Sequence, residues 1–176
     1  MGNTDLTRAS VYVCRQKPAD GSYPQGVRLE LIHYKDMTAF KNTCKEYLRV
    51  TDKQVFYFDY ENIPGVYISE TWICPELFTL VRFVSGLPEN EQIAFSAWLD
   101  VFRPDLGEIE PESLEDKFRY SYEGYYRTKE QFGQHYARER MSIIPDGESG
   151  FNLKAYTWML FDGMFVFRDG YVFKNT

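Results

Sequence analysis

Carboxylates are the residues of this chain whose number and spacing suggest a specific chemistry. Seven of them fall within the seventeen residues 100–116, where the one cation is Arg103: Asp100, Asp105, Glu108, Glu110, Glu112, Glu115 and Asp116. In a helix with a rise of about 1.5 Å per residue, such acids would average about 3.6 Å apart along the axis. Phosphates along one DNA strand are about 3.4 Å apart. The two linear charge densities are comparable, although Pro104, Gly107 and Pro111 interrupt any continuous helix.

A second group of acids precedes this segment: Asp59, Glu61, Glu70, Glu76, Glu89 and Glu91. Asp59 and Glu61 fall at the end of an aromatic run and either do acid-base work, hold a hard cation, or simply face solvent. For residues 100–116 the simplest interpretation is likewise a solvated acidic loop. If instead both groups form an ordered outward array, they are candidates for contacts with a basic partner.

The negative charge is concentrated in the middle of the chain. The net charge of the whole chain is −6, but residues 1–50 carry +3, residues 51–116 carry −11 and residues 117–176 carry +2. An acidic chain of this kind is a poor direct binder of nucleic acid, which attracts proteins through their cations. We expect no direct nucleic-acid binding.

The composition is that of a folded protein with an excess of aromatic residues. Of 176 residues, 44% are hydrophobic and 18% are aromatic, including 14 Tyr. No apolar run reaches the roughly 20 residues that a membrane span needs, and residues 1–10 lack a secretory signal. Three widely spaced cysteines indicate free thiols in or near the core. We therefore expect a cytoplasmic protein that does not associate with membranes.

Hydrophobic periodicity and capping signals predict an α+β fold with three modules. Residues 1–62 should form a small antiparallel sheet with a helix capped by Asp36. Residues 63–117 should form an acidic module of short helices. Residues 118–176 should form a mixed module whose helices are capped by Thr128 and Asn152, ending in a hairpin that turns at residues 169–170.

The usual signatures of catalysis are absent from the sequence. His33 and His135 are the two histidines and stand in no metal-ligand or triad spacing. The glycine-rich phosphate-binding motifs Gly-x-x-x-x-Gly-Lys-Ser/Thr and Gly-x-Gly-x-x-Gly do not occur. We expect no catalytic residues, no metal and no cofactor, so a non-enzymatic role is favoured. An enzyme that uses carboxylates and tyrosines in a deep pocket stays open as an alternative.

Several short motifs, in their order along the chain, resemble those of ArdA-type antirestriction proteins of conjugative plasmids and transposons. They are Val11-Tyr12-Val13, Phe58-Asp59-Tyr60-Glu61, Leu87-Pro88-Glu89 through Trp98-Leu99, Tyr122-Glu123-Gly124-Tyr125-Tyr126, Ala155-Tyr156 and Gly170-Tyr171-Val172-Phe173. The resemblance extends from about Val11 to Lys174. It implies an elongated homodimer of three small domains whose carboxylates imitate the phosphates of bent double-stranded DNA. It also implies that such a protein occupies the DNA-binding groove of type I restriction-modification enzymes and so protects incoming DNA.

The residues and the resemblance together predict an antirestriction DNA mimic that binds the methyltransferase core of a type I enzyme. The seven acids of residues 100–116 are its primary phosphate surrogates, and the six preceding acids are secondary ones. The alternative is an adaptor that binds a regulatory or conjugation protein through its exposed Tyr and Trp side chains. Binding by a mimic should weaken strongly with salt, whereas binding by an aromatic adaptor should not.

Overall fold

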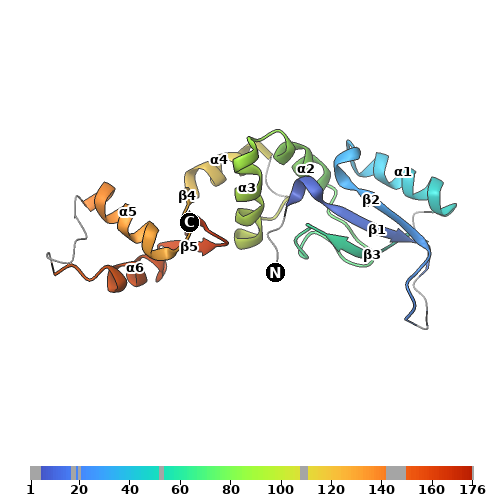
Figure 1. Ribbon diagram of the computed structural model, residues 1–176. Helices are drawn as coiled ribbons and strands as arrows, with labels where there is room; N and C mark the ends of the chain where they lie inside the picture. The colour runs from blue at the N-terminus through green and yellow to red at the C-terminus, as the bar shows by residue number, and fades with distance from the viewer. Residues whose placement is uncertain are drawn as a thin grey trace. The chain divides into compact units, whose positions relative to one another are not determined.

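The computed structural model describes residues 5–16, 19, 21–51, 54–107, 111–141 and 150–175 (Figure 1). The chain forms two compact units, Met1–Leu114 and Glu115–Thr176. Within the described residues, each unit combines helices with a three-stranded antiparallel sheet. The predicted α+β class is therefore confirmed. The division of the first unit into two modules at residues 62–63 stays a prediction.

The first unit is built on a sheet with strand order β2-β1-β3. Strands β1 (Ser10–Cys14) and β2 (Gly26–Glu30) are antiparallel neighbours in this predicted sheet, and β3 (Phe56–Glu61) pairs with the other edge of β1. Gly26 lies so close to β1 that an added Cβ would meet the Val13 carbonyl oxygen at 2.0 Å. A side chain at this position would force the two strands apart.

Helix α1 (Met37–Leu48) covers one face of this sheet. It begins as predicted, because the Asp36 carboxylate accepts a hydrogen bond of 2.8 Å from the Ala39 amide. Phe40 of α1 is fully buried and packs against Tyr57 of β3 and Phe78 of the next helix, with ring centroids 6.2 and 5.1 Å away. One aromatic cluster thus joins the sheet to the helices that follow.

The predicted acidic module of residues 63–117 contains helices α2 (Leu77–Ser85) and α3 (Glu89–Phe102). The apolar residues Leu77, Leu80, Val81 and Val84 of α2 are buried. All of residues 94–99 are buried in α3, so this helix is enclosed over its middle turns rather than on one face. The buried Ser96 hydroxyl donates to the Gln92 carbonyl at 2.9 Å and accepts from the Leu6 amide at 3.2 Å. The bond from Leu6 ties the 3-10 turn η1 (Leu6–Arg8) to the middle of α3.

The second unit has a sheet with strand order β4-β6-β5. The predicted hairpin is present: β5 (Phe165–Arg168) and β6 (Tyr171–Lys174) are antiparallel neighbours. Asp169 and Gly170 between them both have positive φ angles, of 52° and 92°, as the tightest hairpin turns require. Strand β4 (Tyr122–Tyr125) pairs with the free edge of β6.

Three helices accompany this sheet: α4 (Pro111–Ser121), α5 (Lys129–Met141) and α6 (Leu153–Phe161). Thr128 and Asn152 cap α5 and α6 as predicted, accepting from the amides three residues ahead at 3.2 and 3.0 Å. Helices α5 and α6 approach closely where Gly133 faces Thr157. The core beneath them consists of Phe132, Leu160, Phe165 and Val172.

Candidate partner-binding site

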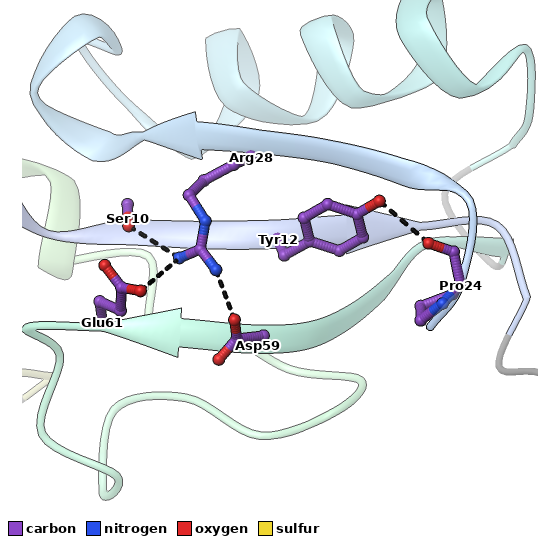
Figure 2. A network of polar contacts seen from close by, with 6 residues as sticks. All are labelled: Ser10, Tyr12, Pro24, Arg28, Asp59 and Glu61. Carbon is purple, nitrogen blue, oxygen red and sulfur yellow. Dashed lines mark hydrogen bonds and ion pairs between the residues drawn. The ribbon is translucent and has the colours of Figure 1, made fainter. Parts of the chain in front are cut away.

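A network on the open face of the first sheet contains two of the predicted acids (Figure 2). The strand register places Arg28 of β2 and Asp59 of β3 on either side of Tyr12, with Glu61 beside Ser10. The Arg28 guanidinium bonds Asp59, lies 3.4 Å from Glu61 and donates to the Ser10 hydroxyl at 3.2 Å. One cation therefore bridges both carboxylates across three strands.

A β-bulge explains why these acids face away from α1. The register between β1 and β3 shifts by one residue: Val13 is opposite Tyr57, but Tyr12 is opposite Asp59, so Phe58 has no residue opposite it on β1. Because side chains alternate between faces, the extra residue sends Tyr57 into the core and Asp59 to the open face. The bulge therefore places Asp59 and Tyr57, which are two residues apart, on opposite faces of the sheet.

Because Asp59 and Glu61 are paired with Arg28, less of their negative charge is available to imitate phosphates. Partial burial opposes the charge of Arg28, but the hydrogen bond to Asp59 and the fields of both carboxylates outweigh it and raise the arginine pKa overall. An incoming cation would have to compete with Arg28 for the same oxygens. Their role as secondary contacts stays a prediction.

Two of the primary acids, Asp100 and Asp105, lie at the end of α3 and in the loop after it. Asp100 is half-buried in the last turns of α3. Asp105 is exposed, and its Oδ1 accepts a hydrogen bond of 2.9 Å from the Gly107 amide. The carboxylate of Asp105 is thus oriented by the backbone rather than by a neighbouring cation.

The remaining primary acids fall in α4 or outside the described residues. Glu115 pairs with Arg119 at 2.7 Å one helical turn away, and Asp116 is exposed on α4. Glu112 lies in the first turn of α4. Glu108 and Glu110 lie outside the described residues.

Three of the four secondary acids in residues 62–107 are exposed: Glu70, Glu76 and Glu89. Glu91 is half-buried in the first turn of α3, which begins at Glu89. The Glu76 carboxylate accepts from the Cys74 thiol, with Sγ and Oε2 3.1 Å apart. Glu76 and Asp105, far apart in sequence, line one surface cleft of about 450 Å³.

Buried thiols and phenols are held in their neutral forms. Burial raises the pKa of Cys74 to about 11, and the hydrogen bond to Glu76 acts in the same direction. Burial also raises the pKa values of Cys14 and Tyr67. All three cysteines are free and buried, which confirms the prediction from their spacing. The raised pKa values leave Cys14, Cys74 and Tyr67 unsuited to act as nucleophiles at neutral pH.

The two histidines belong to different units. His33 is exposed with Nε2 3.2 Å from Glu30, and His135 lines a cleft of about 330 Å³ with Glu123 and Glu139. Across the described ranges, no group of three or more His, Cys, Asp or Glu side chains could hold a metal ion. The same residues contain no helix of the length and apolarity that crossing a bilayer requires.

Sequence reasoning missed two residues that shape these surfaces. Arg28 pairs with Asp59 and Glu61 and so neutralises part of their charge. The alternation of apolar and charged residues along its strand could have indicated that Arg28 lies on the same polar face as these acids. Trp72, 49% exposed on the wall of the 450 Å³ cleft, lay in a stretch with no periodic pattern.

Comparison with known proteins adds no relative. No protein-family model and no curated protein sequence matches this chain. The resemblance to ArdA-type antirestriction proteins therefore depends on the short motifs alone.

Proposed function

We propose that this protein is an antirestriction DNA mimic that occupies the DNA-binding groove of a type I restriction-modification enzyme. The observation that carries the proposal is the excess of carboxylates over cations in residues 62–107, three of them exposed and outside any ion pair of the described residues. These residues hold six carboxylates, of Glu70, Glu76, Glu89, Glu91, Asp100 and Asp105, against two arginines, Arg82 and Arg103. Glu76, Glu89 and Asp105 are exposed and form no ion pair within the described part of the chain.

Such a surface suits a partner whose groove is lined with Lys and Arg. Fixed carboxylates there gain charge-assisted hydrogen bonds that are shorter and stronger than neutral ones. They also speed the encounter, because long-range attraction steers the partner toward the acidic face. The choice of a type I enzyme as partner, the homodimeric state and the cytoplasmic location come from the sequence and its resemblance, and are part of the proposal.

The proposal is tested by displacement of DNA. The purified chain is titrated into a type I methyltransferase core bound to a fluorescent duplex, and anisotropy reports release of the DNA. The chain should displace the duplex at low salt and progressively less well as salt screens the attraction. If the chain displaced no DNA even at low salt, the proposal would be contradicted.

A second candidate function is supported by an exposed apolar pair on α6. Trp158 and Met159 are 71% and 51% exposed in the second unit. A large aromatic side chain of this kind often anchors a protein interface. An adaptor role would make binding to its partner sensitive to Trp158→Ala and nearly insensitive to salt, which is the opposite of the pattern expected for the mimic.

A further inference from the structure

We infer that the cleft beside Trp72 binds the guanidinium group of an arginine side chain presented by a partner protein. The cleft lies between the segment of residues 66–76 and the loop of residues 103–107 that follows α3, and its volume is about 450 Å³. That volume is within the usual range of about 300–1,000 Å³ for ligand sites. The inference deepens the proposed function, on which it rests for the source of the arginine.

The cleft is a formed feature of the first unit. The Tyr67 hydroxyl donates to the Pro104 carbonyl at 3.0 Å and ties its two walls together. Tyr67 and Leu106 line the cleft and are each 4% exposed, so their side chains are packed in the core. Trp72 is held in a tight turn, where its carbonyl accepts from the Ser69 amide at 2.7 Å. A ligand would therefore meet walls that are already in position.

Two carboxylates on these walls are oriented, and each keeps one oxygen available. Glu76 is engaged through Oε2 by the Cys74 thiol, and Asp105 is engaged through Oδ1 by the Gly107 amide. Within the described residues the second oxygen of each has no hydrogen bond. Arg103 also lines the cleft, but its Nε donates to the Asp100 carbonyl at 3.2 Å and it pairs with neither carboxylate.

The aromatic wall selects the type of cation. Trp72 and Val66 are 49% and 46% exposed, so about half of the indole side chain is accessible in the cleft that the two acids also line. A cation over an indole is attracted by the ring electrons. Arginine suits such a site better than lysine, because its planar guanidinium can stack on the ring and donate to carboxylates in fixed directions.

The charges of the cleft predict how binding divides between these contacts. With Arg103 included, the three ionised groups sum to a single negative charge. Coulomb attraction alone is therefore modest, and the indole must supply a salt-insensitive share. Loss of Trp72 should weaken binding at all ionic strengths, whereas loss of the acids should matter mainly at low salt.

A peptide titration of the full-length protein tests this inference. The ¹⁵N-labelled chain is titrated with acetyl-Gly-Arg-Gly-amide, and the indole N–H signals of its 3 Trp residues are followed by NMR. Trp72→Phe assigns the Trp72 signal, and the exposed Trp158 serves as internal control. We expect a saturable shift of Trp72 alone, with weaker binding of the lysine peptide and none of the peptide in which uncharged citrulline replaces arginine.

Two variants separate the contributions. Trp72→Ala, read from the Gly107 amide, should weaken binding about fivefold at both low and high salt. Glu76→Gln with Asp105→Asn should weaken it about fivefold at roughly 50 mM salt and much less at about 1 M. An unmoved Trp72 signal, or equal binding of the arginine, lysine and citrulline peptides, would overturn the inference. The titration uses no restriction enzyme, so it can fail while DNA displacement succeeds, and the reverse.

Discussion

Replacing Arg28 by Gln should lower stability while making the protein more acidic. The change takes the net charge from −6 to −7 and leaves Asp59 and Glu61 without their shared cation. The Arg28, Asp59 and Glu61 side chains are 34%, 43% and 62% exposed, so solvent screens both ion pairs. Exposed pairs contribute about 0.2–1 kcal/mol each. We therefore expect a loss of about 1 kcal/mol, or a fall in Tm of about 2–4 °C for a chain of this size.

The assay is thermal unfolding followed by circular dichroism at low and high salt. Arg82→Gln is the matched control, because Arg82 is exposed and has no ion pair in the part of the chain that the structure describes. The Arg28→Gln deficit should shrink as salt screens the network, whereas Arg82→Gln should have little effect at either concentration. Arg28→Lys, which keeps the charge but not the fork of donors, should fall between wild type and Arg28→Gln. Equal Tm values for Arg28→Gln and wild type at low salt would refute this interpretation of the network.

Three further changes test the packing, a titrating thiol and a helix cap. Gly133→Ala would place a Cβ 2.3 Å from the Thr157 hydroxyl and should cost about 1–3 kcal/mol in denaturant unfolding; Thr157→Ala in the same chain should recover part of that loss, and additive effects would contradict the contact. The pKa of Cys74 is about 11 in the folded chain against an ordinary 9.0, so the unfolded state loses this proton first and stability should fall between about pH 9 and pH 11. Cys74→Ala should show a shallower fall over that interval, and an unchanged slope would show that the thiol does not contribute. Asn152→Ala removes the 3.0 Å bond to the Ala155 amide and should destabilise the second unit by about 1 kcal/mol, seen as faster amide exchange in the first turn of α6.

Local signals predicted most elements of the fold. The caps at Asp36, Thr128 and Asn152 each fix a helix start through a contact within a few residues, so the sequence alone contains the necessary information. The turn at Asp169 and Gly170 is equally local. Pairings between distant strands, such as β1 with β3 and β4 with β6, depend on packing and could not be predicted in this way.

The candidate site was predictable in composition but not in arrangement. Charge counting identifies Glu76 and Asp105 as acids, but their meeting on one cleft depends on the bond between Tyr67 and Pro104. Asp59 is a second example. A bulge at Phe58 determines which face of the sheet Asp59 lies on, and the guanidinium of Arg28 determines what it binds. Neither feature has a local signature in the sequence.

The central claim is that exposed acids of residues 62–107 stand in for DNA phosphates, and a matched pair of charge variants tests it most directly. One variant combines Glu76→Gln, Glu89→Gln and Asp105→Asn. The other makes the same total charge change at exposed acids elsewhere, with Glu30→Gln, Glu46→Gln and Glu130→Gln. Each is measured for displacement of duplex DNA from a type I methyltransferase core at low salt. We expect the first variant to displace DNA about tenfold or more less well than the second, which should stay close to wild type. Equal displacement by the two variants would contradict the claim.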